Sequence, residues 1–568
     1  MPLAPAREAS SPAELMEQGR AALAAGEPLE AANCFAIAGQ TATADSECRY
    51  WLASALFAAG ETEAARHYLG EAVTLHSVQV VRNLGADAQR MAKDRAYAAA
   101  IAWQLYAAQH MGPASLAFGH ALDFDHLDAQ LFLTYGLSLQ HQGRPEEAAQ
   151  VFLGAVEAFR KPAVHEFLLF ALFFVGDGVR RYAEEARRWT AAYMSGLARR
   201  DSWDNDRNPD RRLRIGYVGP SFTRSQLRQF VMPVLENHDP AAVEVFIYCA
   251  DPSAEDALPA HATVLGVKGL DDAALAERIR GDRIDILVDL WGHTAGSRLG
   301  VFARKPAPVQ VAWVNFVQTT GLDAMDYVLH CDSMDTPGTD ALFTETIWRT
   351  GLIMAPFRPA ADRPPPAPTP ALSKGRITFG SFNNPVKLSD ATVAGWARIL
   401  NGRPGSTLLL KYGPYADPVL QRAVRARFAA HGVAAERLEF QGHSQGADYL
   451  RAFQDIDLAL DPSPCPGGTT TCDALANGVP VLTLKGDDFY ARIGLNAVLA
   501  CGLPELIAES WDDYVAKALA LTEDVAALDA LRARVRPGFE ASAFRDEAGF
   551  TRRLEADFRR MFEIWLER

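Results

Sequence analysis

The sequence predicts a helical first part followed by two α/β domains, and three observations lead to this fold class. A helix–turn–helix pattern repeats within the first 200 residues. From residue 211 onward, short apolar strands alternate with helical stretches, which is typical of parallel sheets covered on both faces. A proline-rich spacer, 358–370, divides this alternating part in two. We therefore expect a helical domain over 1–200, a first α/β domain over 211–357 and a second over 371–568.

The helical part repeats a motif: an apolar helix end, a glycine turn, an acidic or proline start, an alanine pair and then an aromatic residue. Gly26 and Gly60 are separated by 34 residues and Gly143 and Gly176 by 33, which is tetratricopeptide spacing. The period is blurred between Gly60 and Gly143, where only Gly112 indicates another turn. We expect about four to five repeats, with a plain helical domain as the alternative. Stacked repeats usually bind protein or peptide on their concave surface.

Composition is that of a soluble globular protein, with 49% apolar and 22% charged residues. The net charge of −14 argues against nucleic acid as the main partner, because neutralising phosphates needs a basic surface. The seven cysteines are scattered without a Cys-x-x-Cys pair, which argues against a disulfide framework or zinc site and fits a reducing cytoplasm. We find no signal-peptide core and no run of ~18 apolar residues. The sequence therefore predicts a cytoplasmic protein without a membrane span.

Two series of apolar runs predict the strands of two parallel sheets. A polar linker, 201–210, precedes the first series. In open α/β sheets, ligands bind beyond the carboxyl ends of the strands, so we expect a ligand in the cleft between the two domains. The expected strands are 213–218, 243–249, 284–290, 309–314 and 327–329 in the first domain, and 377–379, 407–410, 438–440, 458–460 and 481–484 in the second.

The segment 461–480 is the most informative stretch of the second domain. It joins two apolar strands through a loop of small residues and a short helix that begins near Thr469 and Thr470. Free backbone N–H groups and threonine hydroxyls at a helix start can hold a phosphate, and Gly467 with Gly468 permits close backbone approach. Thr470 and Asp473 also match a capping box, which explains Asp473 without a ligand. The segment favours a nucleotide-binding site.

Other loops that follow strands carry candidate ligand-binding groups. Lys387, in Phe-Asn-Asn-Pro-Val-Lys, could place a point charge on a phosphate or be a solvated lysine. His443, in Gln-Gly-His-Ser, could contact a base or lie on the surface. In the first domain, His293 and Thr294 follow a strand and should face the cleft, although a single histidine is more often structural.

Two common nucleotide motifs are missing from the sequence. No G-x-x-x-x-G-K-[ST] or G-x-G-x-x-G stands at a strand–helix turn, so ATPase and dehydrogenase functions lose support. Asp455 and Asp457 resemble the metal-binding Asp-x-Asp of some sugar transferases, but they lead directly into a buried strand. We therefore expect no metal.

Four motifs, in this order, resemble one family: Gly-His-Thr, Trp-Val-Asn-Phe-x-x-Thr-Thr-Gly, Phe-Asn-Asn-x-x-Lys and Cys-x-Gly-Gly-Thr-Thr-Thr-x-Asp. With the helical repeats, they are similar to the O-linked N-acetylglucosamine transferases and the SPINDLY-type transferases. The resemblance implies two Rossmann-like domains in a glycosyltransferase-B arrangement and an inverting, metal-independent enzyme without a cofactor. The donor would be UDP-N-acetylglucosamine (UDP-GlcNAc), and the acceptor a Ser or Thr hydroxyl of a protein bound through the repeats.

The resemblance also assigns roles to individual residues. Lys387 would contact the diphosphate and stabilise the leaving UDP, and Asp473 would bind the ribose. His293, with Lys387, is the second residue that we expect to act in catalysis. The resemblance also places Asn384, Thr469 and Thr470 on the diphosphate, Thr294 on the sugar, and Gln441 and His443 around the uracil. Gly467 and Gly468 are expected to contact the UDP-sugar because glycine permits close backbone approach.

Several positions depart from the family pattern. The stretch 219–226, around Arg224, has serine and no histidine where the family has a histidine discussed as catalytic base. Gly468 replaces a frequent histidine, and 315–317 replaces Gly-Tyr-Pro. Gly446 and Tyr449 replace a lysine and a histidine beside the base. A SPINDLY-like transferase that uses a GDP-sugar, or a catalytically weak nucleotide-sugar-binding scaffold, therefore stays an alternative, and a homodimer stays open.

Overall fold

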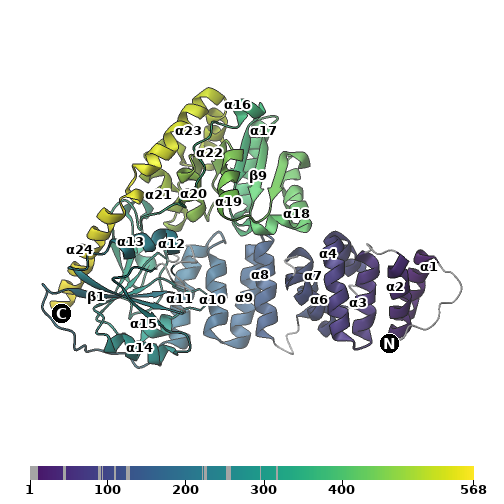
Figure 1. Ribbon diagram of the computed structural model, residues 1–568, viewed down its shortest axis with the longest axis horizontal. Coiled ribbons are helices and arrows are strands. Elements are labelled where there is room, and N and C mark those ends of the chain that lie inside the picture. Colours follow the sequence, from purple (N-terminus) through teal and green to yellow (C-terminus); the bar gives the residue numbers. More distant parts are fainter. Residues whose placement is uncertain are drawn as a thin grey trace. The chain divides into compact units, whose positions relative to one another are not determined.

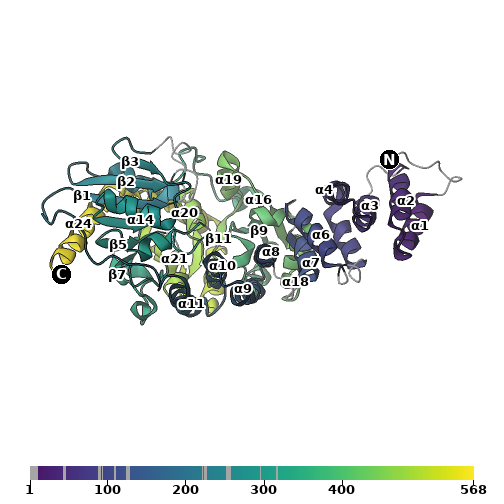
Figure 2. The same ribbon diagram turned by 90° about the horizontal axis from the view of Figure 1, so that it is seen from below.

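The structure is a computed structural model that forms two compact units (Figures 1 and 2). The first comprises residues 1–159, 384–386 and 412–427, and the second comprises 160–383, 387–411 and 428–568. The described residues are 11–41, 46–86, 91, 94–107, 111–122, 128–219, 222, 227–250, 258–294, 296–314 and 317–568.

The N-terminal part consists of successive helix pairs, which confirms the predicted repeats. Figure 1 shows the two helices of each pair lying side by side. The last pair, α10 and α11, belongs to the second compact unit. The pairs are α1 (Pro12–Ala24) with α2 (Pro28–Thr41), α3 (Ser46–Ala58) with α4 (Thr62–Ala86), α6 (Arg95–Ala107) with α7 (Met111–Ala121), α8 (Ala129–His141) with α9 (Pro145–Phe159), and α10 (Pro162–Leu172) with α11 (Gly178–Tyr193).

Glycine and aromatic residues make these pairs as the motif predicts. Gly26, Gly60 and Gly143 lie at turns with φ of +82°, +83° and +71°, a conformation that glycine adopts without steric cost. Aromatic rings of the second helix pack on glycines of the first: a Cβ at Gly136 would lie 2.3 Å from Cε1 of Phe152. Phe152 is fully buried, so the ring fills the space between the helices.

The prediction of a turn at Gly112 is wrong, because this residue lies within helix α7. A Cβ there would lie 2.6 Å from Cγ1 of Val419, so the position needs glycine for close packing rather than for a turn. The period is blurred in this region because α4 runs for 25 residues, about twice the length of α3.

The N-terminal α/β domain contains a seven-stranded parallel sheet in the order β3-β2-β1-β4-β5-β6-β7. The first six strands follow the order of a dinucleotide-binding fold, in which the strand order reverses between β1 and β4. The strands are β1 (Leu213–Gly219), β2 (Val243–Cys249), β3 (Thr263–Gly266), β4 (Ile286–Asp289), β5 (Val309–Ala312), β6 (Tyr327–His330) and β7 (Thr346–Arg349), and the helices are α12 (Leu227–Phe230), α13 (Met232–Asn237), α14 (Asp272–Gly281) and α15 (Leu299–Ala303).

The C-terminal α/β domain repeats this order with six parallel strands, β10-β9-β8-β11-β12-β13. Its last helix, α24, lies beside the sheet of the N-terminal α/β domain, as both views show. There Oε1 of Glu555 lies 2.8 Å from Nδ1 of the buried His238. The strands are β8 (Thr378–Ser381), β9 (Thr407–Lys411), β10 (Leu438–Gln441), β11 (Leu458–Leu460), β12 (Val481–Leu484) and β13 (Ile507–Ala508). The helices are α16 (Ala371–Lys374), α17 (Asp390–Gly402), α18 (Pro418–Ala429), α19 (Gly446–Ala452), α20 (Thr469–Ala476), α21 (Ile493–Ala500), α22 (Trp511–Leu521), α23 (Val525–Glu540) and α24 (Glu547–Leu566).

Every expected strand is present, and the predicted fold class is confirmed. The sequence analysis missed β3, β7 and β13, which all lie at sheet edges. Both β3 and β7 are only partly buried, with an exposed residue at each end, so they lack the continuous apolar run that identifies a buried strand. The strand β13 has only two residues.

Candidate active site

The loop between β11 and α20 forms the centre of the candidate site. Helix α20 begins at Thr469 with Gly468 as its N-cap, and no side chain caps it. Its first backbone bond runs from Cys472 N–H to the Gly468 carbonyl at 3.1 Å, so the N–H groups of the three threonines lie ahead of the helical ladder. Such a helix start attracts anions, as the sequence predicts.

Asp461, at the carboxyl end of β11, fixes this loop through hydrogen bonds. Its Oδ1 accepts a hydrogen bond from Gly467 N–H at 2.7 Å, and its Oδ2 accepts one from the Thr483 hydroxyl at 2.9 Å. Burial raises the pKa of Asp461 to about 6, against the opposing effect of these bonds and of Lys387. A Cβ at Gly467 would lie 2.4 Å from Oγ1 of Thr471, whereas a Cβ at Gly468 would meet only Ile493, at 3.7 Å. Close approach therefore requires glycine at 467 but not at 468.

Lys387 places its ammonium group at the same loop. It ends the short 3₁₀ turn Pro385–Lys387 after β8, and its Nζ donates to the Pro466 carbonyl at 2.7 Å. An ammonium has three donors, so one bond to a carbonyl leaves others for a ligand. The structure thus brings Lys387 to the residue that precedes Gly467.

Asp473 lies on the buried side of α20 and is 6% exposed. Its Oδ1 accepts from Nε2 of Gln229 at 3.2 Å, and its Oδ2 accepts from the Tyr449 hydroxyl at 3.1 Å. Burial raises its pKa to about 6, and these two bonds oppose the rise. The capping-box alternative is wrong, because the cap is Gly468 and the Asp473 carboxylate bonds to residues outside the helix.

Not all of the other predicted site residues of the C-terminal α/β domain bond to the β11–α20 loop or to α20. The Thr470 hydroxyl donates to Oδ1 of Asn383 at 3.0 Å, while Oδ1 of Asn384 accepts from Val386 N–H at 3.1 Å within its own turn. Gln441 ends β10 and is half-buried, and His443 is exposed in the loop that follows. Thr469 begins α20 and is half-buried.

The predicted sugar-side loop of the N-terminal α/β domain is held by internal hydrogen bonds. The Thr294 hydroxyl donates to the Trp291 carbonyl at 3.0 Å. His293 is 1% exposed, and its Nε2 donates to the Thr320 carbonyl at 2.8 Å. Burial lowers the pKa of His293 to about 4, so the ring is neutral at pH 7. A catalytic role for His293 would therefore depend on Nδ1, which has no partner among the described residues.

Buried carboxyl groups fix the backbone around this histidine. Glu345 accepts from Thr320 N–H and from the Thr319 hydroxyl, both at 2.6 Å, and burial raises its pKa. Asp289, at the end of β4, accepts from Trp291 N–H at 3.1 Å and from Gly292 N–H at 2.9 Å, and burial raises its pKa to about 6. The shape of the loop thus rests on buried polar groups.

The last helical repeat contacts both halves of the site within the second unit. The ring of Trp189 on α11 lies edge-on to His293 with centroids 4.6 Å apart. Phe173, just after α10, packs against Tyr490 of the C-terminal α/β domain at 5.0 Å. The Tyr490 hydroxyl lies 3.4 Å from the Cys465 sulfur, which belongs to the β11–α20 loop. Aromatic residues of the repeats therefore support both loops.

Sequence reasoning missed three side chains that hold the predicted ones. Asp461 carried a usable signal, since it is an acidic residue directly after a buried strand. Tyr449 was noted only as a departure from the family pattern. Gln229 sits on the one-turn helix α12 without any motif, and only the fold brings it to Asp473.

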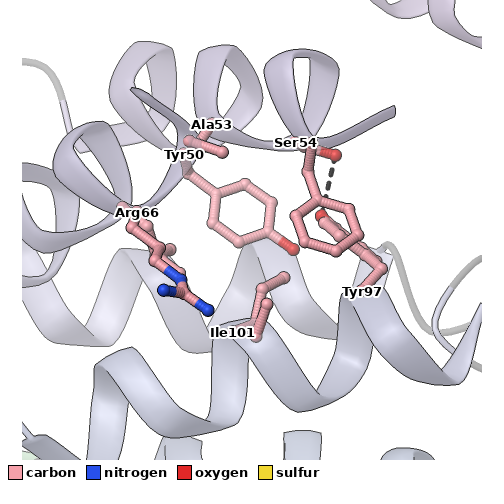
Figure 3. A pocket seen from close by; sticks show the side chains of 10 residues that line it. Tyr50, Ala53, Ser54, Arg66, Tyr97 and Ile101 are labelled. Carbon is pink, nitrogen blue, oxygen red and sulfur yellow. Dashed lines mark hydrogen bonds between the residues drawn. The ribbon is translucent and has the colours of Figure 1, made fainter. Parts of the chain in front are cut away.

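A separate pocket lies among helices α3, α4 and α6 of the first unit (Figure 3). The Tyr97 hydroxyl donates to the Ser54 hydroxyl at 2.7 Å, and Arg66 also lines the pocket. Tyr50 and Tyr97 are both buried, so this pocket is a gap in helix packing.

Among the described helices, none combines the length and apolar character needed to cross a bilayer.

Two α/β domains with parallel sheets, arranged as in a solved O-GlcNAc transferase, place the chain in the glycosyltransferase-B class. Within that class the chain belongs to glycosyl transferase family 41, whose model matches residues 198–345 and 369–554. The predicted family is therefore confirmed.

Named relatives agree with this assignment. A Hordeum vulgare protein named "probable UDP-N-acetylglucosamine–peptide N-acetylglucosaminyltransferase SPINDLY" is 34% identical over 409 residues, covering 70% of this chain and 43% of the relative. The Arabidopsis thaliana protein SEC, with the same enzyme name, is 30% identical and covers 62% of this chain and 37% of the relative. This chain thus spans less than half the length of the curated relatives that it matches.

A solved structure matches almost the whole chain. It is a lysine-to-methionine variant of the Thermobaculum terrenum O-GlcNAc transferase, with a TM-score of 0.72 and 30% sequence identity. The match covers 99% of both chains, so the helical repeats and both α/β domains are shared.

Proposed function

We propose that this protein is an inverting, metal-independent glycosyltransferase that moves N-acetylglucosamine from UDP-GlcNAc to Ser or Thr hydroxyls of proteins. Family membership and the enzyme names of the relatives support the reaction class. The observation that carries the proposal is the Lys387 ammonium at the open start of α20, within one residue of Gly467.

The diphosphate would rest on the start of α20, with Lys387 opposite. In an inverting transfer the acceptor oxygen bonds to the anomeric carbon from the face opposite UDP. The bond between that carbon and the diphosphate oxygen breaks, and UDP leaves with the electron pair. Negative charge grows on the diphosphate as this happens, and the helix start with Lys387 stabilises it. This is the role that a divalent metal has in other transferases, and it is why we propose a metal-independent enzyme.

Asp457 supports the same view, because its carboxylate is fully buried and bonds to two backbone N–H groups rather than facing a ligand site. Its Oδ1 accepts from Ala371 N–H at 2.8 Å, and its Oδ2 accepts from Thr378 N–H at 2.7 Å. The carboxylate therefore ties the start of β8 to the chain before it. We expect transfer activity to persist in excess EDTA, and loss of activity that Mn²⁺ or Mg²⁺ restores would contradict the metal-independent proposal.

On the sugar side, the His293–Thr294 loop would form the wall against the N-acetylglucosamine. Its internal hydrogen bonds give it a set shape, which is what positioning a sugar requires. We assign no general base. The stretch where the family has a histidine falls on 219–226, of which Gly219 and Phe222 alone are described.

The acceptor protein would bind through the helical repeats, which is the usual function of such stacks. Truncating the repeats is unsuitable as a test, because α10 and α11 pack on the catalytic loops. Crosslinking of the full chain to an acceptor, followed by mapping of the crosslinked residues, would test this part of the proposal.

A GDP-sugar donor is the second candidate, because the segment expected to surround the uracil departs from the family pattern at Gly446 and Tyr449. Tyr449, which stands where the family has a histidine, turns its hydroxyl to Asp473.

Calorimetric titration with UDP and GDP distinguishes the two donors, since tighter binding of GDP would overturn UDP-GlcNAc. Transfer of label from radiolabelled UDP-GlcNAc to candidate proteins then tests the reaction. Nucleotide binding without transfer to any of a broad panel of acceptors would favour a nucleotide-sugar-binding scaffold.

A further inference from the structure

The carboxylate of Asp473 is held by donors from two domains. Gln229, on α12 of the N-terminal α/β domain, bonds to one oxygen at 3.2 Å. Tyr449, on α19 of the C-terminal α/β domain, bonds to the other at 3.1 Å. Gln229 and Asp473 are 244 positions apart in sequence, so only the packing of the two domains brings them together.

The backbone of Gln229 is bonded to the segment that joins these two domains. Its backbone carbonyl accepts from Arg358 N–H at 2.8 Å, and Arg358 begins the proline-rich spacer. The Arg358 guanidinium pairs with Glu236 of the N-terminal α/β domain and with Glu547 of α24, each at 2.5 Å. A change in the angle between the domains would therefore move the Gln229 amide relative to Asp473.

Tyr449 is oriented by aromatic packing on the other side. Its ring lies 5.3 Å from that of Phe453, which in turn lies 4.5 Å from that of Phe382. This packing directs the hydroxyl to Asp473 and limits its rotation.

Among the described residues, the hydrogen-bond donors to Asp473 leave half of the acceptor positions of its carboxylate unfilled. Each carboxylate oxygen has two lone pairs, and Gln229 and Tyr449 occupy one on each. Both donors are neutral, so the charge of Asp473 is not cancelled by a cation bonded to it. A pair of adjacent hydroxyl donors, such as the 2′ and 3′ hydroxyls of a ribose, would complete the four acceptor positions.

We propose that Gln229, a residue of the N-terminal α/β domain, positions the sugar nucleotide by orienting Asp473. Together with Tyr449 it sets the plane of the Asp473 carboxylate, so that one acceptor site on each oxygen faces the ribose of a nucleoside diphosphate. Binding of the nucleotide to the C-terminal α/β domain thereby depends on the contact between this domain and the N-terminal α/β domain. This inference rests on the proposed function, in which Asp473 binds the donor ribose.

Titration of the full chain with UDP and with 2′-deoxy-UDP tests the inference. We expect the wild-type protein to bind UDP more tightly than the deoxynucleotide. Gln229→Leu should weaken UDP binding about tenfold, because the Asp473 carboxylate would no longer be oriented to accept one of the two ribose hydrogen bonds. It should weaken 2′-deoxy-UDP binding much less, so that discrimination between the two nucleotides shrinks. Tyr449→Phe should act in the same direction.

Gln454→Leu is the matched control, because its amide bonds to the Pro365 carbonyl outside the site. In transfer assays, Gln229→Leu should raise the KM for the donor and leave kcat nearly unchanged, since ribose binding is the same before and during transfer. A purely structural role would instead lower kcat and the melting temperature together.

Equal weakening of both nucleotides by Gln229→Leu, or no change for either, would overturn the inference and leave the proposed function standing. Tighter binding of GDP than UDP would overturn the proposed donor only, and the same comparison would then be made with GDP and 2′-deoxy-GDP. A wild-type protein that binds neither UDP nor GDP would overturn the proposed function and this inference with it.

Discussion

The two loops of the candidate site are built in opposite ways. At the β11–α20 loop, the threonine N–H groups lie ahead of the helix, and the Lys387 ammonium stands beside them. At the His293 loop, the polar side chains turn inward: Thr294 and His293 donate to backbone carbonyls, and the imidazole is neutral. The first loop offers charge and donors to a ligand, and the second offers mainly a shape.

This difference indicates that the two α/β domains have different roles in the proposed site. The C-terminal α/β domain carries the groups that can stabilise a diphosphate, so removing one of them should act on the reaction. The N-terminal α/β domain holds its loop with buried groups, so removing one of them should act first on stability and on fit to the sugar. Gln229 is the exception, because it belongs to the N-terminal α/β domain but bonds to Asp473 of the C-terminal α/β domain.

The largest expected effect is that of Lys387→Met. Loss of the charge that faces the leaving diphosphate should lower kcat for transfer about 10³-fold. The melting temperature should stay close to that of wild type, because within the chain's described part the half-buried ammonium bonds the Pro466 carbonyl and the neighbouring Cys465 thiol, which both lie in one loop. Lys374→Met, which removes a lysine paired with Asp455, is the control. Retention of at least a tenth of wild-type kcat would contradict the charge-bearing role of this loop.

His293→Ala should act on the other loop through stability. It leaves a cavity against Trp189 and frees the Thr320 carbonyl, which together should cost about 3 kcal/mol of unfolding free energy. Thermal unfolding would measure this loss, with the exposed His431→Ala as control. UDP binding should be unchanged, whereas UDP-GlcNAc binding should weaken. A weaker affinity for UDP itself would remove the distinction between the two loops.

Gly467→Ala and Gly468→Ala form a matched pair within the first loop. A methyl group at 467 collides with the Thr470 and Thr471 hydroxyls, at 2.7 and 2.4 Å, and should weaken UDP binding about 50-fold. At 468 the nearest contact is 3.7 Å, so less than a threefold effect is expected. Calorimetry with UDP would compare the two variants, and equal effects would contradict the packing described for Gly467.

The smallest expected effect is a pH dependence that originates at Asp461. Its folded-state pKa of about 6 is above the value of an unfolded aspartate, so the folded protein binds the proton more tightly. The resulting stability is fully present below about pH 4 and is lost as pH rises through 6. Relative to Asp461→Asn, wild type should therefore lose roughly 2 kcal/mol between pH 4 and pH 7.

Thermal unfolding of wild type and Asp461→Asn across this pH range would measure that difference. Because the variant keeps an oxygen acceptor for Gly467 N–H, the loop should remain in place. A difference in melting temperature that stays constant between pH 4 and pH 7 would show that the Asp461 carboxyl is not neutralised by folding.

The sequence was sufficient for the fold class, the buried strands and the loop at the start of α20. These features have local signals: a glycine turn, a continuous apolar run, or small residues before a helix. The same reasoning failed at Gly112, where glycine serves close packing, and at the edge strands β3 and β7, whose exposed residues resemble those of loops.

By itself the sequence determined which residue types stand at the carboxyl ends of the strands, because strand and loop patterns are read from neighbouring residues. Tertiary structure alone decided that Gln229 and Tyr449 share Asp473, that Asp461 supports Gly467, and that Trp189 covers His293. These contacts join distant segments, and their hydrogen bonds and burial exist only once the sheets and helices have packed. The charges of the site follow from that packing, since burial sets the pKa of each aspartate and of the histidine.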